Sequence, residues 1–139
     1  MELSFAKLHG LGNDFVFIDD RDRALKLTDA QVSYLCDRHF GIGADGVILV
    51  RPATSEEGDG YMHYINADGT LAQMCGNGVR CFAKYLVDRE LADVASGHLL
   101  ADTLAGPRPI AFSVDAGGKM TEATVNLSLI HISEPTRPY

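Results

Sequence analysis

A cysteine in the middle of the chain has the setting of a reactive thiol. Cys75 precedes Gly76, Asn77 and Gly78, and apolar residues then recur at the spacing of a buried helical face: Val79, Phe82, Ala83, Leu86 and Val87. Cys75 is therefore predicted at or just before a helix N-terminus, where unpaired N–H groups and the helix dipole lower the pKa of a thiol and attract anions. Glycine at this point lets the backbone approach a bound group closely. The pattern predicts a reactive thiol beside a carboxylate-binding helix start.

The other two cysteines favour a structural interpretation. Cys36 and Cys81 each fall within a predicted helix, and such cysteines commonly behave as small buried hydrophobes. Cys75 and Cys81 are six residues apart on one helix and should point in different directions, so we expect no disulfide. The 3 cysteines and 5 histidines show no metal-ligand spacing, and no metal site is predicted.

Turn residues and apolar periodicity predict the elements that position Cys75. One helix begins after Thr28, which forms a capping-box pattern with Gln31, and the second runs from Cys75 to about Glu90. Strands are predicted at residues 3–8, 15–19, 47–50, 61–66, 98–102, 109–114 and 121–127. Residues 9–14 are predicted as the turn between the first two strands, and residues 115–118 as the turn of a hairpin between the last two.

Composition and charge exclude two classes of partner. The 139 residues fit one domain, and 46% hydrophobic with 22% charged residues is the balance of a soluble globular protein. A net charge of −7 without a basic run argues against a nucleic-acid partner. Because no apolar stretch reaches transmembrane length and the first residues lack a signal-peptide pattern, we expect no membrane partner and a cytoplasmic protein.

Four motifs in order resemble the diaminopimelate epimerase family. They lie at residues 7–15, 38–46, 66–69 and 74–81, and the resemblance runs from Phe5 to about Leu127. Members of this family invert an α-carbon of diaminopimelate without a cofactor. The resemblance therefore implies an isomerase of lysine and peptidoglycan precursor biosynthesis that interconverts LL- and meso-2,6-diaminopimelate, with no cofactor and a small-molecule substrate.

The resemblance also implies a fold and a set of site residues. The expected fold is α/β (α+β), with a curled, mostly antiparallel sheet wrapped around a central helix. The family has two such halves, with the substrate in the cleft between them, one catalytic cysteine from each half, and a homodimeric assembly. By resemblance Cys75 is the first catalytic cysteine, Asn13 and Asn66 contact the substrate, and the N–H groups of Gly76 and Asn77 hold its α-carboxylate.

The last residues depart from the family where its second half should begin. We expect residues 1–127 to form the N-terminal epimerase domain, residues 128–139 to be an unrelated, artefactual tail, and the C-terminal domain with its second cysteine to be absent. Two alternatives stay open. One is a racemase or isomerase of another amino acid on a related fold, such as a proline racemase or phenazine-type isomerase, and the other is a non-catalytic carboxylate-binding fragment. Asn13 and Asn66 could in that case be simple turn formers.

Overall fold

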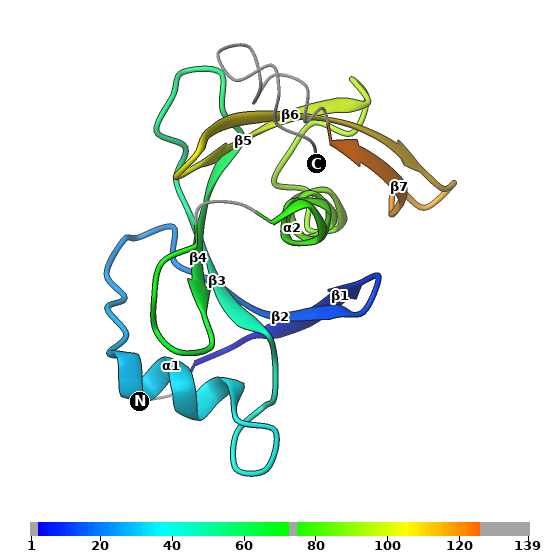
Figure 1. The fold of residues 1–139 in the computed structure, drawn as a ribbon. Coiled ribbons are helices and arrows are strands. Elements are labelled where there is room, and N and C mark those ends of the chain that lie inside the picture. The colour runs from blue at the N-terminus through cyan, green and yellow to red at the C-terminus, as the bar shows by residue number, and fades with distance from the viewer. Residues whose placement is uncertain (1–2, 73–74, 126–139) are drawn as a thin grey trace, which may run out of the picture.

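A single curled sheet wraps around one helix in the computed structural model of the chain, which describes residues 3–72 and 75–125. Figure 1 looks along this helix, with the sheet passing below it, beside it and above it. The strands are β1 (Ala6–Gly10), β2 (Asn13–Asp19), β3 (Gly46–Arg51), β4 (Gly60–Asn66), β5 (His98–Thr103), β6 (Gly106–Val114) and β7 (Met120–Val125), and the helices are α1 (Asp29–Cys36) and α2 (Gly76–Asp88).

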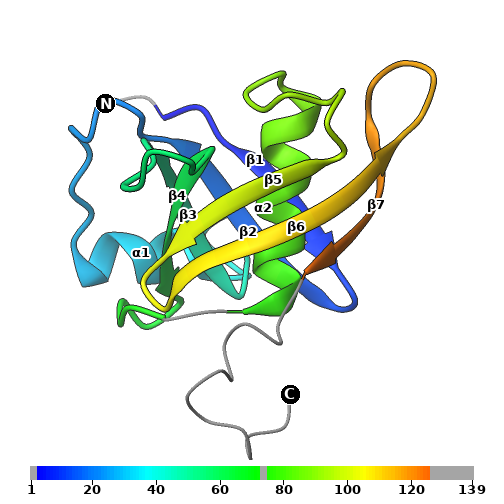
Figure 2. The same ribbon diagram turned by 90° about the horizontal axis from the view of Figure 1, so that it is seen from above.

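The strands lie in the sheet in the order in which they occur along the chain. The pairs β1–β2, β3–β4, β5–β6 and β6–β7 are antiparallel, whereas β2–β3 and β4–β5 are parallel. Parallel neighbours need a crossover connection, and each pair here has one helix in it: α1 between β2 and β3, and α2 between β4 and β5. The two helices lie on opposite faces of the sheet, α1 outside the curl and α2 inside it (Figures 1 and 2).

The two helices create two hydrophobic cores, and β2 contributes to both. Phe15 and Phe17 belong to the core around α2, while the alternate residues Val16 and Ile18 belong to the core beneath α1. Successive side chains of a strand point to opposite faces, and strands covered on both faces carry continuous apolar sequence. The same alternation along β3 explains why its sequence is apolar from Val47 to Val50.

The predicted fold class is confirmed: the sheet is curled, mostly antiparallel and wrapped around a central helix. Each predicted strand and helix is present, and α2 ends at Asp88 rather than near Glu90. The predicted capping box is formed, since the Gln31 N–H donates to Thr28 Oγ1 at 3.1 Å and the Thr28 N–H donates to Gln31 Oε1 at 2.8 Å. The predicted hairpin joins β6 to β7.

The prediction of a turn over residues 9–14 is wrong. β1 reaches Gly10 and β2 begins at Asn13, so the turn consists of Leu11 and Gly12 alone, with φ angles of 51° and 94°. Two consecutive left-handed residues are typical of the tight turn that matches the twist of a hairpin. Strand pairing runs back from this turn to Ala6, so β1 begins at residue 6 rather than residue 3. The correction places Asn13 at the start of a strand.

Some sequence predictions fall outside the described residues. These are the end of the last predicted strand, residues 126–127, and the predicted tail, residues 128–139. Among residues 3–72 and 75–125, no helix is both long and apolar enough to cross a membrane.

Replacing Phe82 by alanine tests the packing of α2 inside the sheet. Phe82 is fully buried, so we expect Phe82→Ala to lower the free energy of unfolding by about 3–5 kcal/mol through lost burial and a cavity. Phe40 is 78% exposed, and the matched variant Phe40→Ala should change the free energy of unfolding by no more than about 0.5 kcal/mol. Urea unfolding followed by circular dichroism measures both values. Equal shifts in the two variants would contradict the described packing.

Candidate active site

Cys75 is the N-cap residue of α2. Its backbone is extended, with φ −145° and ψ 121°, and its carbonyl accepts the first helical hydrogen bond from the Val79 N–H at 2.9 Å. The thiol makes no capping hydrogen bond. The N–H groups of Gly76 and Asn77 belong to the first turn of the helix, whose N–H groups have no acceptor within the helix itself. The predicted place of Cys75 at the helix start is confirmed, and the geometry is that of an anion-binding helix N-terminus.

The first turn of α2 packs directly on the sheet. Gly78 is buried, and a Cβ added to it would lie 3.6 Å from side-chain carbons of both Phe15 and Ile48. Cys75 is half-buried and packs against the same core. The thiol therefore lies at the boundary between a fixed hydrophobic core and the open end of the helix.

Strand register brings the two predicted substrate-contacting asparagines to one end of the sheet. Asn13 pairs with Gly10 at the tip of the β1–β2 hairpin, and two residues further along β2, Phe15 pairs with Gly46 at the start of β3. Gly46 in turn pairs with Asn66, the last residue of β4. The N-terminus of α2 reaches the same end of the sheet (Figure 2), because Asn77 is hydrogen-bonded to Asn13.

A chain of side-chain hydrogen bonds crosses the front of this helix start. Asn77 Nδ2 donates to Asn13 Oδ1 at 2.7 Å, and Asn13 Nδ2 donates to Asp45 Oδ2 at 3.2 Å. At the other end, Arg80 Nη1 donates to Asn77 Oδ1 at 3.3 Å. Asn13 and Asn77 are both half-buried. Two residues predicted separately from the sequence are thus in direct contact.

Asn66 has a different environment. Its Nδ2 donates to Thr70 Oγ1 at 3.1 Å, and its backbone N–H and C=O bond to Thr70 and Gly69 across the turn after β4. Within the described part of the chain, no hydrogen bond joins Asn66 to Asn13 or Asn77. The turn-forming interpretation of Asn66 therefore has direct support in its contacts, and a substrate contact at this position stays a prediction.

The sequence predicted no catalytic or substrate-binding role for a charged cluster that lies behind Asn13. Arg38 forms a two-pronged contact with Asp14 at 3.0 and 2.9 Å, and Lys7 lies 3.1 Å from the same carboxylate. The hydrogen bond from Arg38 is the main reason that the pKa of Asp14 is far below its usual range. Asp45 joins the cluster through Asp14, whose N–H donates to Asp45 Oδ2 at 3.0 Å. The signal was present in the sequence, because these charges all lie within the first two motifs.

The three thiols differ in their surroundings. Burial raises the pKa of Cys81 to about 11, with the nearby Cys75 as a second cause, and burial also raises the pKa of Cys36. Burial raises the pKa of Tyr64 to about 12, again with Cys75 as the next cause. All three cysteines are free, as predicted. Among the described residues, no three His, Cys, Asp or Glu side chains gather as metal ligands.

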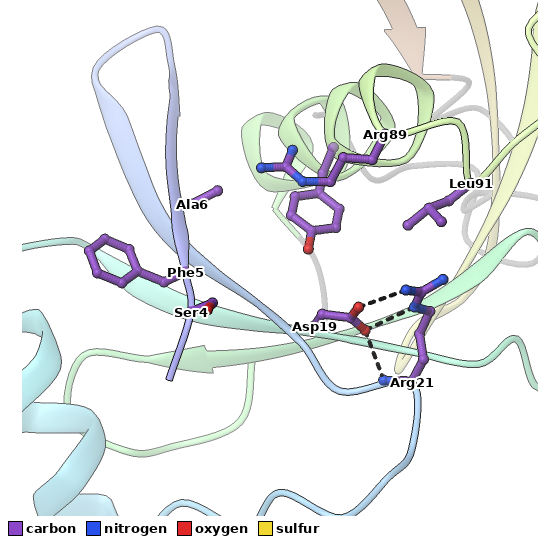
Figure 3. Close-up of a pocket in the computed structure, with 8 residues that line it drawn as sticks. Ser4, Phe5, Ala6, Asp19, Arg21, Arg89 and Leu91 are labelled. Atoms are coloured by element: carbon purple, nitrogen blue, oxygen red, sulfur yellow. Dashed lines mark hydrogen bonds and ion pairs between the residues drawn. The ribbon is translucent and has the colours of Figure 1, made fainter. Parts of the chain in front are cut away.

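A pocket of about 320 Å³ lies at the opposite end of α2 (Figure 3). Its two cations are engaged in local contacts: Arg21 donates to both carboxylate oxygens of Asp19 at 2.9 and 2.8 Å, and the Arg89 guanidinium lies 4.0 Å from the centre of the Tyr85 ring. None of the cysteines is among its described lining residues. The chemistry predicted from the sequence therefore belongs to the other end of the helix.

Comparison with known families gives a match that covers most of the chain. The family "Diaminopimelate epimerase" matches residues 5–127. The chain is 49% identical over 125 residues to a diaminopimelate epimerase of Thermosynechococcus vestitus, covering 87% of this chain and 42% of that protein. It is 43% identical over 139 residues to one of Mycolicibacterium smegmatis, covering 90% of this chain and 47% of that protein. The chain thus spans less than half the length of these curated relatives.

Solved structures share the fold at low sequence identity. A probable proline racemase from Agrobacterium radiobacter aligns with a TM-score of 0.69 and 12% identity, covering 89% of this chain and 41% of that one. A methylitaconate-delta-isomerase aligns with a TM-score of 0.70 and 12% identity, covering 86% and 36%. At this identity the likeness shows the fold alone.

Alkylation of the three cysteines tests the assignment of Cys75. We expect iodoacetamide near neutral pH to label Cys75 at least about tenfold faster than Cys36 or Cys81, because burial and a raised pKa keep those two thiols protonated and inaccessible. Peptide mass spectrometry measures the three rates. In urea the rates should converge, which serves as the control. Labelling of Cys81 as fast as Cys75 in the folded chain would contradict the assignment.

Removing the Arg38 side chain tests the charged cluster. Because the folded pKa of Asp14 is lowered, the contribution of this contact to stability is complete above the unfolded pKa of about 3.9 and is lost as the pH falls through the folded value. Arg38→Ala should therefore lower the urea midpoint near neutral pH and lose this effect in strong acid. Arg38→Lys keeps the positive charge but cannot form the paired hydrogen bonds of a guanidinium, and it should retain part of the stability. A pH-independent difference would contradict this origin.

Proposed function

Because this chain belongs to the diaminopimelate epimerase family, we propose that it forms one half of the active site of an epimerase that interconverts LL- and meso-2,6-diaminopimelate. The observation that carries the proposal is the half-buried Cys75 thiol at the N-cap of α2, beside the hydrogen-bonded side chains of Asn13 and Asn77. The reaction belongs to lysine and peptidoglycan precursor biosynthesis. We further propose a cytoplasmic protein.

The helix start is suited to stabilising the charge that forms in this reaction. The α-proton of an amino acid is very weakly acidic, so its removal requires stabilisation of a carbanion-like transition state. Part of that charge moves onto the adjacent carboxylate. The first-turn N–H groups of Gly76 and Asn77 are fixed donors that can bind this carboxylate without reorganising during the reaction. The amides of Asn13 and Asn66 are proposed to add contacts to the substrate.

Two acid–base groups on opposite faces of the substrate account for inversion without a cofactor. The Cys75 thiolate takes the α-proton and becomes a thiol, and the electron pair of the broken C–H bond stays on the α-carbon. A second thiol on the opposite face then gives its proton to that carbon and becomes a thiolate. The product has the inverted configuration, and the two groups exchange roles in the reverse reaction.

Neither of the other cysteines of this chain suits the second role. Cys36 is buried in the core beneath α1, on the far side of the sheet from α2. Cys81 is buried six residues further along the chain within α2, and burial raises its pKa to about 11. We therefore propose that residues 1–127 act as the N-terminal half, and that the second half of the longer relatives carries the second cysteine.

Two points of assembly follow from the same proposal. The substrate lies between two halves of similar fold, so the face that presents Cys75 is one wall of a cleft. The complete protein is proposed to be a homodimer, with a small-molecule substrate and no nucleic-acid or membrane partner.

Proton exchange and inversion of LL-diaminopimelate in heavy water test the proposal. We expect residues 1–139 alone to show neither above background, because neither Cys36 nor Cys81 suits the role of proton donor opposite Cys75 and one wall cannot exclude water from the charge. Joining residues 1–127 to a C-terminal half from one of the relatives should give both activities. In that protein Cys75→Ala should abolish inversion.

The outcomes separate the proposal from its alternatives. If the joined protein carries out neither reaction but the chain binds diaminopimelate, the domain is a carboxylate-binding module instead. If the joined protein inverts proline and leaves diaminopimelate unchanged, the substrate assignment is wrong. Inversion by residues 1–139 that Cys75→Ala abolishes would show that a second acid comes from this chain itself.

A further inference from the structure

The two amides at the helix start are held between partners of opposite hydrogen-bonding character. Asp45 at one end is a carboxylate and accepts hydrogen bonds, and Arg80 at the other end is a guanidinium and only donates them. Asn13 and Asn77 lie between them and can each do both. The order of donation is therefore fixed as Arg80 to Asn77 and Asn77 to Asn13, with Asn13 donating onward to the Asp45 carboxylate.

Turning either amide round would set like atoms against each other. A flipped Asn13 would place its oxygen against the Asp45 carboxylate and its NH₂ against the NH₂ of Asn77. A flipped Asn77 would place its NH₂ against Arg80 and its oxygen against the oxygen of Asn13. The oxygen and nitrogen of an amide are similar in size and hard to tell apart by position alone. Here the acceptor Asp45 and the donor Arg80 decide which way each amide is oriented.

Asp45 is itself firmly placed. Its Oδ2 accepts from the Asp14 N–H at 3.0 Å as well as from Asn13, and its Oδ1 accepts from Arg38 Nη2 at 3.3 Å. Its own N–H donates to the Asp14 side chain at 3.1 Å. The carboxylate of Asp14 in turn accepts hydrogen bonds from both Nη1 and Nη2 of Arg38. The charged cluster behind Asn13 therefore holds the acceptor that the amide chain needs.

We propose that Asp45 is a positioning residue that sets the polarity of the Asn13 and Asn77 amides and so keeps N–H donors at the carboxylate-binding helix start. Each amide NH₂ uses one N–H within the chain of bonds, and its second N–H has no partner in the described part of the protein. Both side chains are half-buried and thus retain access to a ligand. The inference rests on the proposed function in one respect: the ligand is a carboxylate next to Cys75.

A pair of alkylating reagents measures this property without catalytic turnover. Iodoacetate and iodoacetamide react with the same thiol, but only iodoacetate carries a carboxylate. The ratio of their rates at Cys75, divided by the same ratio for N-acetylcysteine amide, reports the donors around the thiol and cancels changes in thiol reactivity. We expect this normalised ratio to exceed unity in the wild-type chain despite its net charge of −7.

Variants of Asp45 distinguish charge repulsion from amide orientation, because the two explanations predict opposite changes in the rate ratio. Asp45→Ala removes a negative charge, and simple Coulomb repulsion predicts that iodoacetate then reacts relatively faster. Loss of amide orientation predicts the reverse, and we expect the ratio to fall about threefold to tenfold, the range that follows from losing one hydrogen bond of ordinary net strength. Asp45→Ser, whose hydroxyl is too short to reach Asn13, should behave in the same way and decides the matter if Asp45→Ala does not fold.

Asp45→Asn is the matched control, because it removes the same charge and keeps an acceptor. The N–H groups of Asp14 and Asn13 both direct the carbonyl oxygen of an asparagine to the Oδ2 position, against a single donor from the exposed Arg38 at the other oxygen. The ratio should therefore stay at or above the wild-type value.

Three results would overturn the inference, and they differ in what else they affect. A wild-type ratio no higher than that of the free thiol overturns it together with carboxylate binding in the proposed function. An elevated wild-type ratio that Asp45→Ala and Asp45→Ser leave unchanged or raise overturns the positioning role alone. An equal fall in Asp45→Asn and Asp45→Ala also overturns that role alone, since it would show that keeping a hydrogen-bond acceptor for Asn13 does not preserve the ratio.

Discussion

Burial of α2 in the curl of the sheet is the constraint on which the candidate site depends. Val79, Phe82 and Leu86 are at most 1% exposed, and burying each such side chain contributes about 1.5–3 kcal/mol relative to leaving it in water. The helix cannot slide or turn without exposing this face. Its N-terminus is therefore held at one end of the sheet, and Cys75, as the N-cap residue, is held with it. A reactive group on an ordinary surface loop would lack this precision.

The outer helix serves the same site from the other face. The crossover through α1 is what makes β2 and β3 parallel, so that both strands begin at the end of the sheet where α2 begins. The segment between α1 and β3 carries Arg38 and Asp45, and the core beneath α1 anchors it through Cys36 and Ala44. The charged cluster is thereby brought behind Asn13. Packing on one face of the sheet thus orders the polar groups at its edge.

Local patterns predicted most of the fold, and long-range contacts account for what they missed. The helix starts at Thr28 and Cys75 could be predicted because their signals lie within a few neighbouring residues. The short length of the turn at Leu11 could not be predicted, because a leucine with φ of 51° is unusual and only the pairing of β1 with β2 enforces this conformation. The contact of Arg38 with Asp14 joins residues 24 positions apart, and that of Asn77 with Asn13 joins residues 64 apart. Such pairs have no local signature, although the motifs that contain them were recognised.

A site formed on one face of a domain cannot by itself exclude water from the reacting groups. Fixed N–H donors stabilise a developing negative charge strongly only where the effective dielectric constant is low, since the energy between charges falls in proportion as that constant rises. Gly76, Asn77 and Cys75 are only half-buried in the described part of the chain. In the reaction proposed above, a second surface would therefore have two tasks: to bring a proton donor to the opposite face of the substrate and to exclude water from the first face. If one surface performed both tasks, catalysis would be coupled to closure, because neither acid–base group would be effective until both surfaces were in place.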